Sequence, residues 1–122
     1  MLDYFKDPAN RLKALKFAYN DVHVNQYICW TIERFVLKEL GVKIRLSGIY
    51  DHHPYDECFL LHELIPELVH PNDLGMRIEA NFGAWGDSLH RYYNTPANSL
   101  DCYLEARLIH IQNAIELVKT KI

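Results

Sequence analysis

The sequence predicts an all-α fold, namely an antiparallel four- to five-helix up-and-down bundle formed by a single domain over residues 1–122. The strongest indication is the last 24 residues, where apolar side chains recur at alternating steps of four and three, the spacing of one helix face. These side chains are Leu104, Leu108, Ile111, Ile115 and Val118. Three earlier segments repeat the pattern, and a chain of 122 residues with 49% hydrophobic content can bury a core of its own.

The first helix is expected over residues 8–19. Asp7 followed by Pro8 is a typical helix start, because aspartate caps the first turn and proline fits the first helical position. Asn20 and Asp21 are expected to interrupt the chain after it.

The second helix is expected over residues 22–40. It should end at Gly41, the residue type that closes helices in the left-handed conformation. Its apolar face comprises Val24, Ile28, Ile32, Phe35, Val36 and Leu40. The run from Ile28 through Cys29 to Trp30 also indicates burial on more than one face.

Residues 42–54 are the least helical part of the chain, and we expect an extended crossover there. Val42, Ile44 and Leu46 alternate with polar residues, which is the period of a short strand. A lone strand has no obvious pairing partner in this sequence, so the crossover is the preferred interpretation. The sequence leaves open whether residues 42–50 pair.

Two further helices are expected before the C-terminal one. The third starts at Asp56 and ends near Ile65, because Pro66 lacks the amide N–H that a helix interior requires. The fourth lies within residues 74–93, with Leu74, Ile78, Phe82, Trp85, Leu89 and Tyr93 as its apolar residues. Asn98-Ser-Leu-Asp then provides the start signal of the fifth.

The charge of the chain argues against broad nucleic-acid binding. Its net charge is −3 and its pI is near 6.1, so there is no strong electrostatic footprint for nucleic acid. A short basic cluster consists of Arg34, Lys38, Lys43 and Arg45. Clusters of one sign and this length are common on helix surfaces, so we interpret these residues as a solvated face.

The cysteines and the N-terminal residues favour a soluble, cytoplasmic protein. Cys29, Cys58 and Cys102 are widely spaced and form no CxxC pair, a pattern typical of reduced thiols. Cys29 is expected in the core. The sequence shows no secretory signal, and no stretch approaches the roughly 18 apolar residues of a membrane span.

A group of histidines and acids over residues 51–70 contains metal-compatible ligand types, but its spacings do not match known sites. His62-Glu63 begins like a zinc-protease signature, yet Pro66 stands where the second histidine is needed. Glu67 and His70 form one Glu-x-x-His pair, whereas di-iron bundles need two. The weak metal candidates are His52, His53, Glu57 and His62. We interpret the group as a polar loop and the wet face of a helix, and expect no metal or other cofactor.

Aromatic and basic residues near the end of the fourth helix are candidates for partner binding. Phe82, Trp85 and Leu89 share one face and are expected in the core. Arg91 and Tyr92 follow, and not all side chains there can point inward. Tyrosine and arginine are favoured at protein interfaces, although a helix end with snorkelling side chains explains them equally well.

The order of these signals resembles the HEPN (higher eukaryote and prokaryote nucleotide-binding) proteins. The resemblance covers about residues 20–120. It rests on the helix containing Glu33 and Lys38, on Leu61-His62-Glu63-Leu64, and on an aromatic helix ending Leu89-His-Arg91-Tyr92-Tyr93 before a capped final helix. The resemblance implies a helical module that binds a nucleotide or a nucleotidyltransferase-type partner, with a homodimer as one arrangement.

The ribonuclease motif of that family is not in its expected place. HEPN ribonucleases carry an arginine and a histidine separated by four to six residues on a helix. Arg45 and His52 have that separation but lie in the expected crossover, whereas Arg107 and His110 lie on a helix with only two residues between them. The resemblance therefore implies the non-nucleolytic branch, in which such a pair can bind a phosphate without cleaving RNA.

Three functions follow in order of preference. The first is a non-catalytic binding module for a partner protein or a nucleotide, with Arg45, His52, His62, Arg91, Tyr92, Arg107 and His110 as candidate binding residues. The second is an inhibitor or immunity-type protein that neutralises a toxin or nuclease, as in toxin–antitoxin or defence systems, because an acidic surface can steer onto a basic partner. The third is a metal- or histidine-dependent ribonuclease.

Overall fold

The computed structural model is mostly helical, which confirms the all-α fold class for the residues it describes. These residues are 2–25, 27–46, 57–58, 61–68, 89, 92–95 and 101–122. The helices are α1 (Pro8–Asn25), α2 (Ile28–Leu40), α3 (Leu61–Leu64) and α6 (Asp101–Lys119), and the 3₁₀ helices are η1 (Leu2–Lys6) and η2 (Pro66–Leu68). The strands are β1 (Ile44–Arg45) and β2 (Glu57–Cys58).

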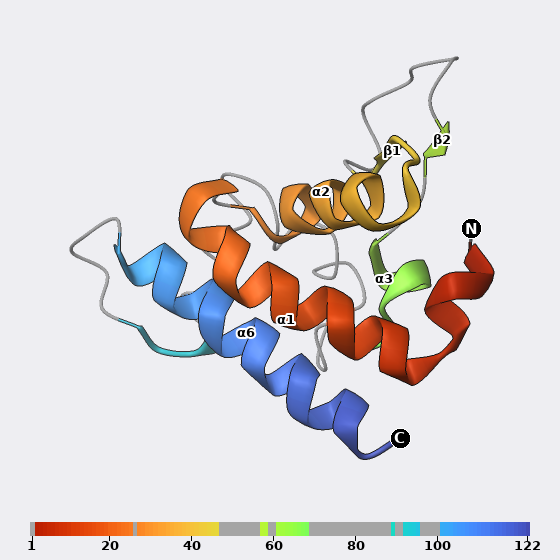
Figure 1. Cartoon of the computed structure of the whole chain (residues 1–122). Helices are drawn as coiled ribbons and strands as arrows, with labels where there is room; N and C mark the ends of the chain where they lie inside the picture. The colour runs from red at the N-terminus through yellow and green to blue at the C-terminus, as the bar shows by residue number, and fades with distance from the viewer. Residues whose placement is uncertain are drawn as a thin grey trace.

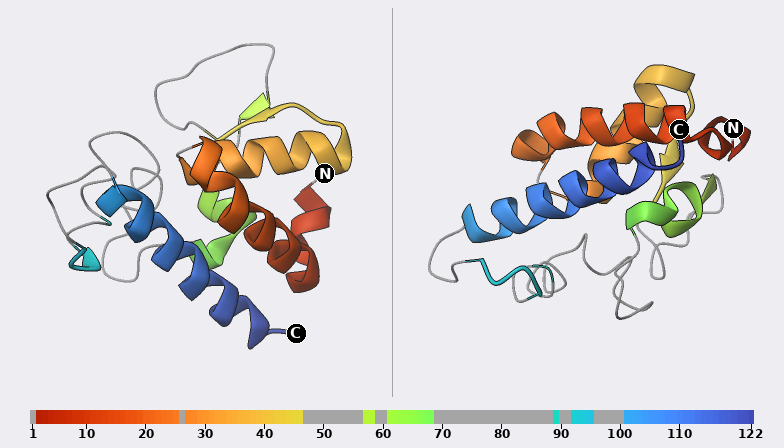
Figure 2. Two further views of the ribbon diagram at one scale, coloured as in Figure 1. Left: turned by 60° about the vertical axis from the view of Figure 1, so that its left-hand side comes forward. Right: turned by 90° about the horizontal axis from the view of Figure 1, so that it is seen from below.

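Helix α1 lies between α2 and α6 and packs against both (Figure 1). It runs antiparallel to each of them (Figures 1 and 2). An ion pair between Lys13 and Glu39 joins the start of α1 to the end of α2, as expected for an antiparallel pair. The side chains of Ala14 and Ala18 are fully buried on α1, and their small size allows neighbouring helices to approach closely.

The start of α1 is the one that the sequence predicts. The Asp7 carboxylate accepts a hydrogen bond from the Ala9 backbone N–H at 2.9 Å, and Pro8 occupies the first helical position. The preceding 3₁₀ helix η1 was not expected. Its Phe5 side chain is buried in the core, which ties the N-terminal residues to the bundle.

The boundary between the first two helices differs from the prediction. Helix α1 continues through Asn20 and Asp21 to Asn25, because polar side chains bond within the helix; the Asn20 amide donates to the Lys16 carbonyl at 3.2 Å. Helix α2 begins only at Ile28, after Tyr27, whose backbone is extended (φ −105°, ψ 139°). Val24 was expected on the apolar face but is 75% exposed, which corrects that assignment.

The end of α2 confirms the prediction for Gly41. Its φ is 69°, in the left-handed region that favours glycine, and its N–H bonds to the Leu37 carbonyl at 3.0 Å. This closes the helix and turns the chain into β1.

Ile44 and Arg45 pair in parallel with Glu57 and Cys58, so the expected unpaired crossover is wrong at these positions. The partner strand lies where the sequence predicts the first turn of the third helix, and for that reason it was missed. Ile44 and Leu46 are buried, consistent with the period of two read from the sequence. Residues 47–54 of the expected crossover lie outside the described residues.

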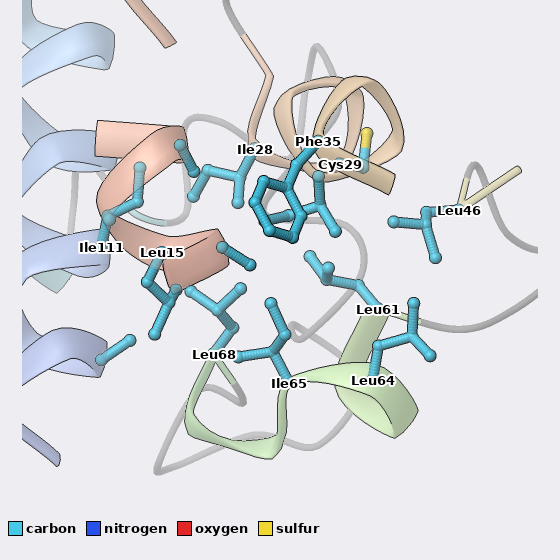
Figure 3. Close-up of a cluster of buried hydrophobic side chains, with 14 of the residues drawn as sticks. Leu15, Ile28, Cys29, Phe35, Leu46, Leu61, Leu64, Ile65, Leu68 and Ile111 are labelled. Carbon is cyan, nitrogen blue, oxygen red and sulfur yellow. The ribbon is translucent and has the colours of Figure 1, made fainter. Parts of the chain in front are cut away.

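The third helix is shorter than predicted because residues 57–58 belong to β2. Helix α3 covers only Leu61–Leu64, and η2 starts at Pro66, as expected from the missing N–H of proline. Three buried side chains of the core, Leu64, Ile65 and Leu68, come from this segment and pack beneath α1 and α2 (Figure 3).

Helix α6 confirms the helical periodicity of the C-terminal residues. Ile111, Ile115 and Val118 are buried, and Leu104 and Leu108 are partly buried against the same core. Of the expected fourth helix, only Leu89, Tyr92 and Tyr93 are described; Leu89 and Tyr92 are helical, and Leu89 is buried as predicted. Within the described part of the chain, no helix has the length and apolar character required to cross a membrane.

Candidate functional site

The face of α2 that points away from the core carries two large apolar side chains. Ile28, Ile32 and Val36 are fully buried on the inner face, which places Trp30 and Leu37 on the opposite side of the helix. Trp30 is 44% exposed and Leu37 is 52% exposed. We define the outward face of α2 by Trp30, Arg34 and Leu37.

This position of Trp30 corrects the expectation that the run from Ile28 to Trp30 is buried on more than one face. The information was present in the sequence: the helical stripe of Ile28, Ile32 and Phe35 already places residue 30 opposite the core. Its apolar neighbours obscured that periodicity.

The Trp30 ring is held in place by its neighbours. The Tyr27 ring meets it edge-on, with ring centroids 4.6 Å apart and an interplanar angle of 90°. On α6, the Arg107 guanidinium lies over the same Tyr27 ring at 4.9 Å from its centroid. Arg107, a predicted binding residue, therefore supports Tyr27 and through it Trp30, while being only 6% exposed itself.

His110, the other member of the predicted pair on α6, is 4% exposed and uses both ring nitrogens within the protein. Nε2 lies 2.9 Å from the Leu68 carbonyl oxygen and Nδ1 lies 2.8 Å from the Tyr93 hydroxyl. Because a carbonyl only accepts, Nε2–H donates to Leu68. With the ring proton on Nε2, Nδ1 accepts a hydrogen bond from the Tyr93 hydroxyl, whose pKa is raised by burial. This arrangement joins η2, α6 and residue 93.

Replacing Tyr93 by phenylalanine should destabilise the fold by about 1–3 kcal/mol, because the buried Nδ1 of His110 loses its donor. Tyr19→Phe is the matched control. Tyr19 is 36% exposed on α1, so we expect a change within about 0.5 kcal/mol. Urea denaturation of both variants measures the difference, and equal losses would contradict the His110 arrangement.

The remaining predicted site residues are not brought together by the described structure. Arg45 is half-buried in β1, and Tyr92 is 41% exposed with its ring edge-on to Tyr93 at 4.8 Å. Tyr92 is thus one of the side chains in this region that point outward. The others cannot be placed in a site: His52, His53 and Arg91 lie outside the described residues, and so do the side chains of Glu57 in β2 and His62 in α3.

No group of three or more His, Cys, Asp or Glu side chains that could bind a metal ion occurs in the ranges that the structure describes.

One acid of the predicted histidine and acid group has a different role from the one expected. Glu67 was assigned to the wet face of a helix, but its side chain is fully buried. It is the acceptor in a buried ion cluster that the sequence did not reveal.

The ion cluster consists of Arg11, Glu67 and Lys121. Arg11 Nε and Nη2 each donate to a different Glu67 oxygen at 3.0 Å, and Lys121 Nζ donates to Oε2 at 2.6 Å. Arg11 Nη1 also donates to the Phe5 carbonyl at 2.8 Å. Burial alone would raise the pKa of Glu67, but the hydrogen bonds from Lys121 and Arg11 outweigh it and hold the pKa below its usual value.

Beside this cluster lies a partly open pocket of about 330 Å³, lined by Phe5, Lys6, Arg11, Glu63, Leu64 and Pro66. The Arg11 guanidinium in its wall is already occupied by Glu67 and by the Phe5 and Lys6 carbonyls. Its hydrogen bonds fix η1 and η2 to α1. The cluster therefore acts in stability, and the Arg11 guanidinium is already engaged within the protein.

Cys29 lies in the core, as predicted, and burial raises the pKa of its thiol. The thiolate is the reactive form, so alkylation of Cys29 in the folded protein at pH 8 should be no faster than global unfolding. Iodoacetamide labelling with peptide mapping by mass spectrometry measures this rate. Labelling of Cys29 in native protein at the rate found in urea would contradict its buried position.

The HEPN resemblance rests on the sequence motifs quoted above. Comparison of the chain with protein-family models, with curated proteins and with solved structures finds no match.

Proposed function

We propose that this protein is a non-catalytic binding module that engages a partner protein through the outward face of α2. The observation that carries the proposal is the exposed Trp30 ring, braced by Tyr27 and Arg107. Tryptophan, tyrosine and arginine are the residue types that dominate binding energy at protein interfaces.

Bracing of Trp30 favours binding because it reduces the entropy lost when a partner docks. An exposed aromatic side chain that is already ordered has less rotamer freedom to lose, typically about 0.5–1.5 kcal/mol for each side chain immobilised. Leu37, seven residues further along α2, extends the apolar surface in the direction of the helix axis by about 10 Å. The two side chains thus form an elongated contact surface.

The contacts of His110 and Arg107 argue against these two residues as the acid–base pair of a ribonuclease. A general acid or base must reach the proton that it transfers, but both His110 nitrogens already bond to protein groups. Arg107 is 6% exposed and lies over the Tyr27 ring. Both residues instead support the surface and the packing around it.

The proposal includes the finer expectations from the sequence. These are a complete antiparallel bundle of four to five helices, a HEPN-like arrangement with a nucleotidyltransferase-type partner, and a cytoplasmic location. A toxin or nuclease as the partner would assign the protein to the inhibitor or immunity type instead.

Affinity purification from the source organism, followed by native mass spectrometry, tests the proposal. The full chain should retain a stoichiometric protein, and the variant combining Trp30→Ala with Leu37→Ala should lose it while remaining folded by circular dichroism. Val24→Ala is the matched control, because Val24 is 75% exposed on α1 and lies off this face. The proposal would be overturned if the double variant still retained the partner protein. It would also be overturned if a nucleotide were the only molecule that co-purified with the wild-type chain.

A further inference from the structure

The outward face of α2 also carries positive charge, although the whole chain has a net charge of −3. Arg34 lies between Trp30 and Leu37 in the sequence, and its side chain is 54% exposed. Lys38 follows one turn after Arg34 and is exposed. The carboxylate that pairs with Arg34, that of Asp21 on α1, has a side chain only 12% exposed and lies 3.5 Å from Nε. The solvent therefore meets mainly the two cations.

The charges and the apolar side chains occupy defined positions around α2. At 3.6 residues per turn, Trp30, Arg34 and Leu37 fall within about 60° of one another. Lys38 marks the edge toward α1, because its Nζ lies over the Phe17 ring at 5.7 Å from the centroid. Glu33 marks the opposite edge, where its carboxylate accepts the Leu46 N–H at 3.3 Å. The surface thus has an apolar line with a basic border on the α1 side.

We propose that the outward face of α2 binds an acidic amphipathic helix of the partner protein. This inference rests on the proposed function and specifies the chemistry of the partner. Apolar residues of that helix, spaced seven apart, pack on Trp30 and Leu37, since recognition of a helix typically uses such a spacing. Aspartate or glutamate residues on its adjoining face pair with Arg34 and Lys38 along the α1 edge, which gives the complex its orientation.

A second copy of this chain fits the two cations less well than an acidic helix does. In a two-fold contact between two α2 helices centred midway between Trp30 and Leu37, Arg34 lies opposite Glu33 of the other copy, whose carboxylate already accepts the Leu46 N–H. Lys38 lies opposite Cys29 in that contact and gains no carboxylate. An acidic helix supplies a carboxylate to each cation.

The same surface is less suited to nucleic acid than to an acidic helix. A phosphate backbone requires a series of cations, and the described residues of this face supply two, Arg34 and Lys38. Leu37 contributes apolar area that matches a leucine or isoleucine of a helix and offers nothing to a phosphate.

Zero-length carbodiimide cross-linking of the purified complex tests the pairing directly, because the reagent joins a lysine amine only to a carboxylate in contact with it. We expect Lys38 to be joined to an aspartate or glutamate within a helical segment of the partner. Lys16, exposed on α1, is the matched control and should give no such product.

Charge reversal gives a second, quantitative test. Arg34→Glu combined with Lys38→Glu should reduce retention of the partner at least about tenfold, whereas Lys16→Glu should leave it unchanged. If the partner depends on Trp30 but not on these charges, the inference fails and the proposed function survives. Retention abolished by nuclease, or cross-links from Lys38 to a second copy in an isotopically mixed sample, also overturns it. If retention of no partner depends on Trp30, the proposed function fails, and the inference that rests on it fails as well.

Discussion

Substituting Glu67 with glutamine should reduce the free energy of unfolding by about 3–5 kcal/mol. The Glu67 side chain is fully buried and accepts two hydrogen bonds from Arg11, whose side chain is 10% exposed. Without the carboxylate, the guanidinium charge stays buried and uncompensated, which is the costly half of breaking a buried ion pair. Urea denaturation at pH 7 measures the loss.

Two comparisons separate this effect from a general loss of charge. Glu63→Gln alters an exposed carboxylate on α3 and should change stability by no more than about 0.5 kcal/mol. Arg11→Met combined with Glu67→Gln should cost clearly less than the sum of the single substitutions, because the two side chains act as a unit. Additive losses would show that the pair is not coupled.

The same cluster predicts the acid sensitivity of the fold. The folded-state pKa of Glu67 lies below the ordinary value of 4.5, so its contribution to stability is present above about pH 4.5. That contribution is lost as the pH falls through the folded pKa. The stability difference between the wild type and Glu67→Gln should therefore be constant from pH 6 to 7 and shrink below about pH 4.5. A difference that grows on acidification would contradict this assignment.

The sequence predicted those features that depend on local spacing. The apolar period of α6 and the Gly41 helix end are both set within one or two turns, and both are found in the structure. The pairing of Ile44 with Glu57 could not be predicted in this way, because the strands contain two residues each and lie more than ten residues apart. Their register depends on how the intervening chain brings them together.

The candidate site was only partly predictable, for a related reason. Arg107 was identified from its proximity to His110, but its contact is with Tyr27, 80 residues away in the chain. Glu67 carried no local signal of burial, since a glutamate is ordinarily exposed unless it is paired. Its partners, Arg11 and Lys121, lie near opposite ends of the chain, and the antiparallel packing of α1 and α6 brings them together.

Helix α1 joins the two halves of the described core, and Leu15 is its most informative residue. Leu15 is fully buried in the same cluster as Ile28 of α2, Leu68 of η2 and Ile111 of α6 (Figure 3). Leu15→Ala should therefore cost about 2–5 kcal/mol, because a cavity opens where these elements meet and fixed helices on both sides limit its collapse.

Leu12→Ala is the matched control for Leu15→Ala, since it removes the same atoms from a half-buried position one turn earlier on α1. Its loss should be clearly smaller, because solvent already reaches part of that side chain.

Urea denaturation should also show a single transition for the Leu15→Ala variant by both tryptophan fluorescence and circular dichroism. If α1 couples α2 to α6, the two signals weaken together. Separate transitions would mean that the α1–α2 pair, which carries Trp30, stays folded without α6. In that case the contact of Arg107 with Tyr27 would not be needed to maintain the shape of the proposed binding surface.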